Sequence, residues 1–182
     1  MHPLKIIERY YNPDSKAYKI LVIHAALVTK KALEIAKRVP KLKPDLEFIQ
    51  EAGMLHDIGI FRTKAENIDC HGDKPYLCHG YLGKEILEKE GLPKHALVCE
   101  RHTGVGITKE EIEKNDLPLP ARDLMPITVE EEIICFADKF YSKNPESLRE
   151  EKSLDEIREE LSKFGKDKVE KFNKMCDKFK KR

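Results

Sequence analysis

Apolar residues recur every three or four positions along most of this chain, and this period restricts the fold more than any other feature. The clearest run ends at Pro40 and consists of Leu21, Ala25, Val28, Ala32, Ile35 and Val39. Such spacing places the side chains on one face of an α-helix, and proline ends the run because it cannot extend the hydrogen-bond ladder. No segment shows the sustained alternation of a β-strand, so the sequence predicts an all-α fold.

The same pattern divides the rest of the chain into helices and loops. We expect helices from Pro44 through His56, from His79 to Gly91, from Pro93 to His102, from Thr108 to Asn115 and from Thr128 to Tyr141, followed by two amphipathic pieces separated by Gly165. Segments 61–78 and 117–126 contain glycine or proline and little periodicity, so we expect irregular loops there. The apolar stripe of the last helix either closes the core or pairs with a second copy of the chain, which leaves a homodimer open.

Length and charge limit the class of protein. A chain of 182 residues with 40% hydrophobic content predicts a single globular domain over residues 1–182. Charged residues reach 37%, yet the net charge is +1, so no overall field attracts nucleic acid or an anionic membrane. Nucleic acid is therefore not expected as a partner, and any attraction for an anionic substrate must be local.

The compartment is predicted from what the sequence lacks. Residues 1–10 have no long apolar core of a signal peptide, and no run is long enough to span a membrane. Five cysteines form no tight framework, so we expect free thiols. These features predict a cytoplasmic protein that does not bind membranes.

Several histidines and aspartates fall where the helical pattern calls for apolar residues. His56 follows Ala52 by four positions, Asp138 follows Ile134 by four, and His24 flanks the apolar face of the first long helix. A core histidine can be satisfied by a backbone carbonyl, but a buried aspartate such as Asp57 needs a cation or several donors. A neighbouring lysine, Lys139, is expected to point away from Asp138.

His79 and His102 are weaker candidates for the same site. His79 stands at a helix start, where it could act as a cap, and His102 at a helix end, where it could interact with the helix dipole. The other histidines, His2, His71 and His95, have no such context and are expected at the surface. Four histidines with two carboxylates suit a divalent transition metal, with Fe or Mn favoured and Co, Ni or Zn as alternatives.

The order His, His-Asp, His, His, Asp resembles that of the HD-domain phosphohydrolase superfamily. The segment from Met54 to Gly59 is similar to its HDIG variant, and Ala137-Asp138-Lys139 resembles a dinuclear subgroup that includes hydrolases of diadenosine tetraphosphate. The stretch from Arg101 to Asp138 is most similar to a small archaeal HDIG family. The resemblance implies a helical HD core at residues 20–142, with a C-terminal helical extension at residues 145–182.

The resemblance also implies a ligand set and a reaction. His24, His56, Asp57 and Asp138 would hold one metal, and Asp57 would bridge to a second metal held by His79 and His102. The expected activity is hydrolysis of a phosphoester or phosphoanhydride in a nucleotide or dinucleotide by metal-activated water, with Asp57 as the catalytic residue. Either Asp57 or Glu100 would accept the proton.

Phosphate-binding residues are harder to predict. Many HDIG proteins have lysine after the glycine, where this chain has Ile60, so Arg62 or Lys64 would have to substitute. The full set of candidates for substrate binding is Arg62, Lys64, Arg101, Thr103, Arg122 and Lys139. In a chain this rich in lysine and arginine, each of them could equally be a solvated surface charge.

Three other hypotheses about the function remain open. A mononuclear HD-type nucleotidase would need only His24, His56, Asp57 and Asp138. A di-iron oxygenase is a second alternative, because the HD scaffold that the chain resembles also hosts oxidative chemistry. A non-catalytic zinc protein would instead use Cys70-His71 and Cys78-His79, although adjacent ligands fit a tetrahedral site poorly.

Overall fold

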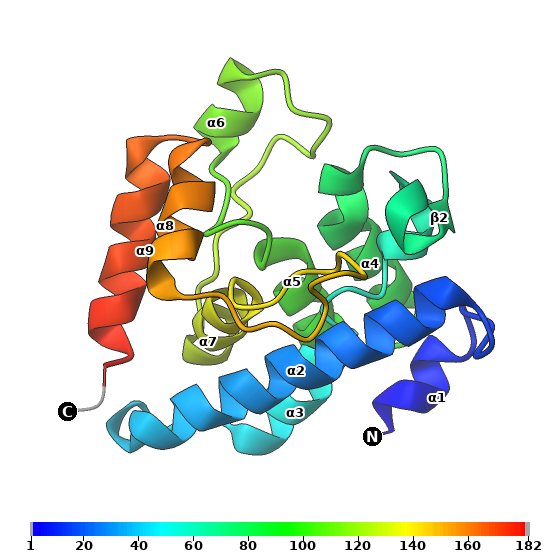
Figure 1. Cartoon of the computed structure of the whole chain (residues 1–182), viewed down its shortest axis with the longest axis horizontal. Helices are drawn as coiled ribbons and strands as arrows, with labels where there is room; N and C mark the ends of the chain where they lie inside the picture. The colour runs from blue at the N-terminus through cyan, green and yellow to red at the C-terminus, as the bar shows by residue number, and fades with distance from the viewer. Residues whose placement is uncertain (1, 181–182) are drawn as a thin grey trace.

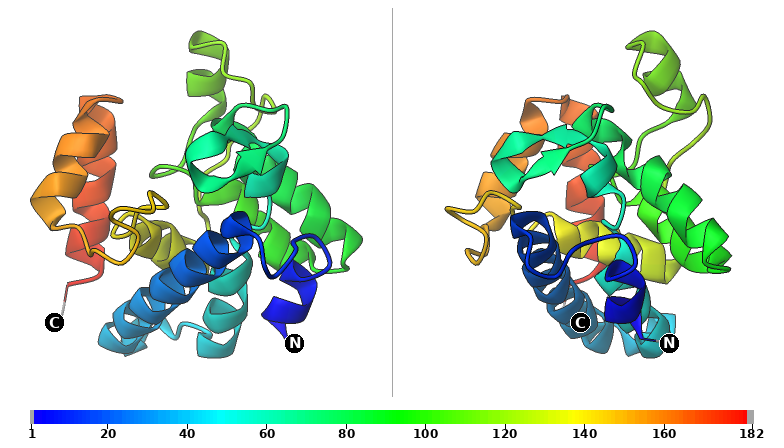
Figure 2. Two further views of the ribbon diagram at one scale, coloured as in Figure 1. Left: turned by 45° about the vertical axis from the view of Figure 1, so that its right-hand side comes forward. Right: turned by 90° about the vertical axis from the view of Figure 1, so that its right-hand side faces the viewer.

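The computed structural model describes residues 2–180 and is built almost entirely of helices (Figures 1 and 2). The predicted all-α class is confirmed. The α-helices are α1 (Pro3–Ile7), α2 (Lys16–Arg38), α3 (Leu46–Leu55), α4 (His79–Lys89), α5 (Pro93–Arg101), α6 (Lys109–Lys114), α7 (Val129–Asp138), α8 (Leu154–Ser162) and α9 (Lys166–Lys178).

The long helix α2 supports the rest of the molecule and runs across the lower part of Figure 1. Its first turn is capped by Ser15, whose side chain accepts a hydrogen bond from the Tyr18 amide. It ends at Arg38, two residues before Pro40, as the sequence predicts. The buried face of α2 includes His24 among alanine, leucine, isoleucine and valine side chains, so a polar residue lies within the apolar stripe.

One hydrophobic cluster joins α2, α3 and α7 to the C-terminal helices α8 and α9. Asp45 caps α3 and Thr128 caps α7, so both helices start where the sequence indicates. The apolar stripe of α9 packs inward: Phe172 is fully buried, and its ring centroid lies 5.3 Å from that of Phe136 in α7. The stripe therefore closes the core of this chain.

A second cluster joins α1 and the first half of α2 to α4, α5 and the residues that follow α3. Pro93 starts α5, and the positive φ angle of Gly91 (74°) ends α4 in the left-handed region that glycine adopts easily. The capping box predicted from Thr108 and Glu111 is present at α6. Helix α1 has no counterpart among the helices expected from the sequence.

Segment 61–78 is more ordered than the predicted loop. Its backbone forms short 3-10 turns and a small antiparallel hairpin, in which β1 (Lys64–Ala65) pairs with β2 (Cys70–His71) in the register Lys64 to His71 and Ala65 to Cys70. Each strand has only two residues, too few to show alternation in a sequence. The hairpin stands above the N-terminal half of α2 (Figure 2).

Two further findings concern burial. Over residues 2–180, no helix combines the length and the apolar character needed to cross a bilayer. The expectation that His95 lies at the surface is wrong: this residue is 9% exposed, and its Nε2 lies 3.3 Å from a carboxylate oxygen of Glu51. His71 is exposed, as expected.

Candidate metal centre

Five segments bring the six predicted ligands to one place. His24 comes from the middle of α2, His56 and Asp57 follow α3, His79 opens α4, His102 follows α5, and Asp138 ends α7. Each of the six is at most 8% exposed. Residues up to 114 positions apart in the sequence therefore meet in one buried cluster of imidazoles and carboxylates.

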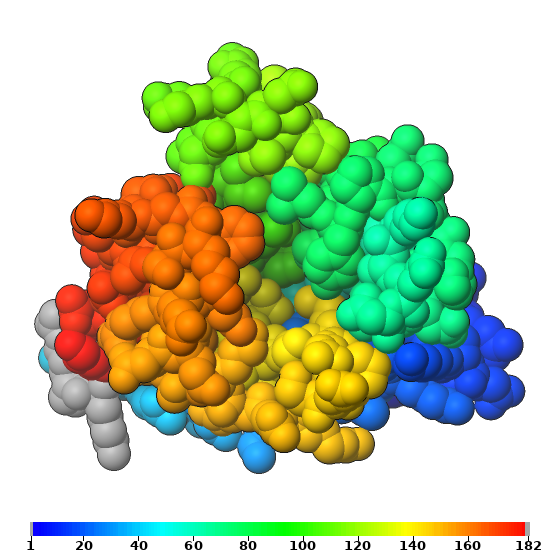
Figure 3. All heavy atoms as spheres, turned by 45° about the horizontal axis from the view of Figure 1, so that its top comes forward, coloured from blue at the N-terminus to red at the C-terminus, as the bar shows by residue number. Residues whose placement is uncertain are grey.

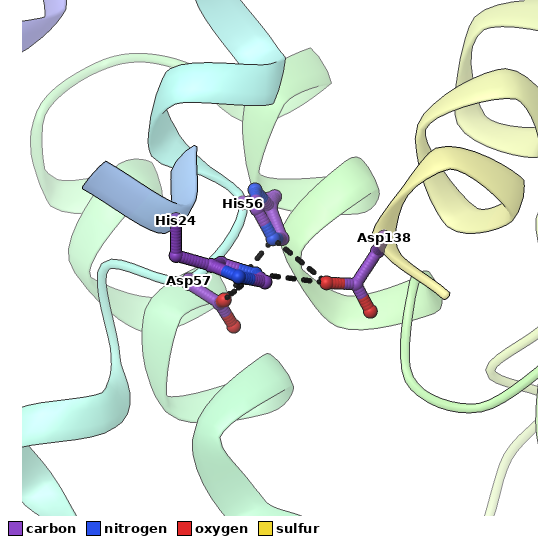
Figure 4. A group of neighbouring side chains, drawn as sticks. All are labelled: His24, His56, Asp57 and Asp138. Atoms are coloured by element: carbon purple, nitrogen blue, oxygen red, sulfur yellow. Dashed lines mark hydrogen bonds and ion pairs between the residues drawn. The ribbon is translucent and has the colours of Figure 1, made fainter. Parts of the chain in front are cut away.

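The first group in this cluster contains His24, His56, Asp57 and Asp138 (Figure 4). The Nε2 atom of His24 lies 3.2 Å from Asp57 Oδ2 and 3.0 Å from Asp138 Oδ1. The Nε2 atom of His56 lies 3.0 Å from Asp57 Oδ2 and 3.4 Å from Asp138 Oδ1. Two imidazole nitrogens and two carboxylate oxygens thus face one point.

The second group contains Asp57, His79 and His102. The Nε2 atoms of both histidines lie 3.3 Å from Asp57 Oδ1, and they are 3.1 Å from each other. Asp57 therefore turns Oδ2 toward the first group and Oδ1 toward the second. This is the arrangement of a carboxylate that can bridge two cations.

Backbone hydrogen bonds fix the tautomer of three imidazoles. The Nδ1 atoms of His56, His79 and His102 each lie 2.7 Å from a backbone carbonyl oxygen, those of Gly53, Tyr76 and Cys99. A carbonyl only accepts, so Nδ1 carries the proton and donates it. A neutral ring then presents the Nε2 lone pair inward, which is the state of a metal-binding histidine.

This tautomer leaves lone pairs facing one another. His79 and His102 direct two Nε2 lone pairs at each other across 3.1 Å, and both also face a carboxylate oxygen. Asp57 Oδ1 is buried without a hydrogen-bond partner and faces only these two nitrogens. Buried acceptors that face only acceptors are costly unless a cation lies between them. The donor set therefore fits divalent metal ions.

The two groups differ in their protonation. Burial lowers the pKa of His56, but Asp57 and Asp138 outweigh it and raise that pKa to about 9. Burial dominates at His79, where the pKa falls to about 3, and it also lowers the pKa of His102. The second group is thus held as neutral imidazoles even without metal.

The carboxylates are held ionised by nearby cations. Burial would raise the pKa of Asp57, but Lys143 and His56 hold it well below its usual range. For Asp138, Lys139 and Lys143 have the same effect against burial. Lys139 Nζ lies 2.8 Å from Asp138 Oδ2, so the expectation that Lys139 points away from Asp138 is wrong. The lysine turns back at the end of α7 to reach the carboxylate.

Lys143 is a member of this centre that the sequence did not reveal. Its Nζ atom lies 2.6 Å from Asp57 Oδ2 and 4.0 Å from Asp138 Oδ1, and its side chain is 13% exposed. The residue lies in the linker after α7, five positions beyond Asp138. In a chain with 34 lysines and arginines, no spacing distinguishes it. Its position depends on the path of an irregular linker.

Most of the predicted basic candidates are engaged by carboxylates. Arg62 pairs with Glu85 at 2.7 Å, and Arg101 donates to both carboxylate oxygens of Glu131 at 3.1 Å. The structure thus places Arg62 and Arg101 in ion pairs that tie α4 and α7 to the segments beside the centre.

The loop after α6 is anchored in the same way. Arg122 binds Glu100 with Nε at 3.1 Å, and Glu100 is only 4% exposed. This contact gives the Glu100 carboxylate a structural role. Thr103 lies against the first turn of α4, and Lys64 lines a pocket beside the centre.

Gly59 brings the two groups together. A Cβ atom at this position would lie 2.3 Å from the His79 carbonyl oxygen and 2.4 Å from the Gly83 amide nitrogen. The φ angle of Gly59 is −82°, which any residue can adopt, so the requirement for glycine is steric. The backbone after Asp57 packs directly on the first turn of α4, which carries His79. Ile60, where the resemblance leads one to expect a lysine, is fully buried in the core.

The cysteine-containing alternative does not match this geometry. His71 is exposed and pairs with Asp69, whereas His79 turns to Asp57. The thiols of Cys70 and Cys78 donate to the carbonyls of Ile68 and Pro118. Within residues 2–180, neither group of potential metal ligands includes a cysteine.

Comparison with known families agrees with this helical fold and its cluster of histidines and aspartates. The HD domain model matches residues 21–142, and the chain belongs to the HD domain family. No solved structure matches.

Similar proteins come from archaea. The chain is 41% identical over 121 residues to the uncharacterized protein MJ0778 of Methanocaldococcus jannaschii, covering 65% of this chain and 64% of that protein. It is 38% identical to a tRNA (cytidine(56)-2'-O)-methyltransferase of Picrophilus torridus, over 71% of this chain and 33% of that protein. A protein of the same name in Thermoplasma volcanium is 30% identical, over 85% of this chain and 41% of that protein. The chain thus spans less than two thirds of each of these relatives.

Proposed function

We propose that this protein is a metal-dependent phosphohydrolase whose centre binds two divalent transition metal ions. The observation that carries the proposal is the position of Asp57, which offers one oxygen to each of two groups of imidazole lone pairs. Two cations joined by a carboxylate can hold both the attacking and the leaving oxygen of a phosphoryl transfer. Membership of the HD domain family supports the same reaction class.

The residues of the chain have separate roles in this mechanism. When bound, the metals supply an activated water and neutralise the charge that develops on the phosphoryl oxygens. The carbonyls of Gly53, Tyr76 and Cys99 hold three imidazoles in the metal-binding tautomer. Asp57 holds the two halves of the centre together. In the net reaction, the water oxygen bonds to phosphorus, the bond to the leaving oxygen breaks, and the leaving oxygen takes a proton.

The substrate we favour is a nucleotide or dinucleotide. The relatives named as tRNA methyltransferases add RNA to the candidates that should be tested, since a nucleic acid partner would also present phosphates. The matched region is 33% and 41% of those proteins, which leaves most of each chain for the methyl-transfer reaction in its name. The HD domain match supports hydrolysis rather than methyl transfer for the region that this chain shares with them.

The test combines metal counting with an activity panel. Purified protein loaded with Mn or Fe is expected to bind two equivalents and to hydrolyse at least one of a set of nucleotides, dinucleoside polyphosphates, cyclic dinucleotides and end-phosphorylated tRNA. Asp73→Ala is the matched control because Asp73 is an exposed aspartate paired with Lys74. One equivalent of metal would favour the mononuclear nucleotidase, and methyl transfer to tRNA without hydrolysis would overturn the proposal.

A further inference from the structure

A pocket of about 360 Å³ adjoins the metal centre where segment 60–78 meets the linker between α7 and α8, teal against yellow in Figure 3. Its polar lining residues are Lys64, Asn67, Tyr76, Ser142, Lys143 and Asn144. Two of these residues also contact the ligands: Lys143 pairs with Asp57, and the Tyr76 ring stacks on His79 with centroids 4.8 Å apart. The pocket and the centre therefore share a wall.

The charged side chains that line this pocket are both positive, and one of them, Lys143, is paired with Asp57. Two lysines and no acidic residue line it. Arg62 and Arg122 near the centre are bound by glutamates, whereas Lys64 has no carboxylate within ion-pair distance among residues 2–180. The other polar lining groups are the side chains of Asn67, Tyr76, Ser142 and Asn144, which can donate hydrogen bonds. Together these features favour an anionic ligand.

The Lys143 ammonium contacts the same Asp57 oxygen that a metal ion in the first group would contact. This ammonium lies 2.6 Å from Asp57 Oδ2, the same oxygen that faces His24 and His56. Two cations cannot share a buried carboxylate oxygen without strong repulsion. The lysine belongs to a linker outside any helix, and it already lines the pocket, so the side chain has space in which to move.

We propose that Lys143 is an exchangeable cation, which neutralises Asp57 in the metal-free protein and binds a second anionic group of the substrate once metal is bound. Lys64 completes this subsite. The inference rests on the proposed function and narrows it to phosphate compounds that carry a second phosphate beyond the one that reacts. Such a compound places one phosphate at the metals and the other between Lys143 and Lys64.

The exchange is tested without measuring activity. Lys143→Met removes a competing cation, so the affinity for Mn²⁺ measured by calorimetry is expected to rise several-fold. The same change removes the lysine partner of Asp57 in the metal-free state, so the melting temperature of the metal-free protein should fall by about 5 °C or more. The melting temperature of the metal-loaded protein should fall much less. Lys152→Met is the control, because Lys152 lies in the same linker and pairs with Glu160 away from the pocket.

The subsite is tested with two ligands that differ by one phosphate. Metal-loaded wild-type protein is expected to bind adenosine 3′,5′-bisphosphate at least about fivefold more tightly than adenosine 5′-monophosphate. Lys143→Met should abolish this preference, Lys64→Met should weaken it, and Lys152→Met should leave it intact. An unchanged preference in both pocket variants would overturn the subsite, and unchanged or weaker Mn²⁺ affinity in Lys143→Met would overturn the exchange.

Failure of the proposal for Lys143 and Lys64 can be distinguished from failure of the proposed function by the variant His56→Ala. If His56→Ala bound as much metal as wild type, the metal centre itself would be wrong, and the exchange and subsite would be wrong with it. If the metal is lost in His56→Ala and hydrolysis is present while the lysine variants behave as wild type, only the role of Lys143 and Lys64 is refuted.

Discussion

The two halves of the metal centre share one aspartate but differ in how their charge is balanced. The half formed by His24, His56 and Asp138 contains a second carboxylate and is contacted by Lys139 and Lys143. The half formed by His79 and His102 has no carboxylate beyond Asp57 and consists of neutral rings. The first half is therefore an anionic site that lysines neutralise, and the second is a lone-pair site that holds little charge.

This difference predicts unequal metal affinity. A site with two carboxylates attracts a divalent cation more strongly than a site with one shared carboxylate, but it must also release its lysine. We expect the first half to fill at lower metal concentration and the second to fill only when Asp57 has already been positioned. The variants that follow separate the two halves.

The largest effect is expected from Asp57→Ala, which removes an oxygen from both halves. Both metals should be lost, and activity should fall by more than the roughly 10–100-fold that loss of a supporting partner costs. Metal analysis and hydrolysis assays check this, with Asp73→Ala as control. Retained hydrolysis in the Asp57 variant would contradict the mechanism.

Loss of one half should follow from His102→Ala. This variant keeps His24, His56, Asp57 and Asp138, so about one equivalent of metal should remain while the second is lost. In Asp138→Asn the first half should be weakened, with the metal dissociation constant raised about 10–100-fold. Titration with Mn²⁺ followed by calorimetry distinguishes them. Equal loss of both ions in His102→Ala would mean that the halves are not separable.

The protonation difference can be measured in metal-free protein. His56 has a raised pKa of about 9, so its stabilisation is complete below its unfolded pKa near 6.5 and is lost as pH rises toward 9. His79 has a lowered pKa of about 3, so its contribution is present above about 6.5 and is lost as pH falls toward 3. Nitrogen NMR of the imidazoles should show His56 charged and His79 neutral at pH 7. A neutral His56 and a charged His79 at pH 7 would contradict the difference in protonation between the two halves.

The smallest effect on metal binding is expected from Cys70→Ser combined with Cys78→Ser. Both thiols bond to backbone carbonyls and neither belongs to a ligand group, so the metal content should match wild type. Stability should fall slightly, because a buried thiol is replaced by a hydroxyl. Metal analysis after gel filtration is the measurement. Release of metal would instead support the hypothesis of a non-catalytic zinc site at Cys70-His71 and Cys78-His79.

The sequence predicted most of the fold because the information is local. The apolar period, the capping pattern of Thr108 and Glu111, and Pro40 as a stop mark helices within a few residues of where they occur. The six candidate ligands were predicted from polar residues on apolar helix faces and from the order of the family motif. Both the helical pattern and the order of the motif residues can be found in the sequence without knowing the path of the loops.

What the sequence did not predict depends on the loops and on the pairing of distant charges. Lys143 reaches Asp57 only because the linker after α7 folds back over the centre. Arg101 and Arg122 are candidates for substrate binding, and their ion pairs with Glu131 and Glu100 were not predicted. His95 was expected at the surface, yet α5 carries it against Glu51. No local pattern records which of many charges will meet.

The contact at Gly59 has a consequence for how this centre could change over evolution. Because a methyl group there would meet backbone atoms of α4, residue 59 sets the separation between the aspartate and the helix that carries His79. An alanine would push that helix outward and pull one set of ligands from the other while leaving His24, His56 and Asp138 in place. In the proposed two-ion centre, one added carbon atom on the motif glycine would separate the ligands of one ion from those of the other.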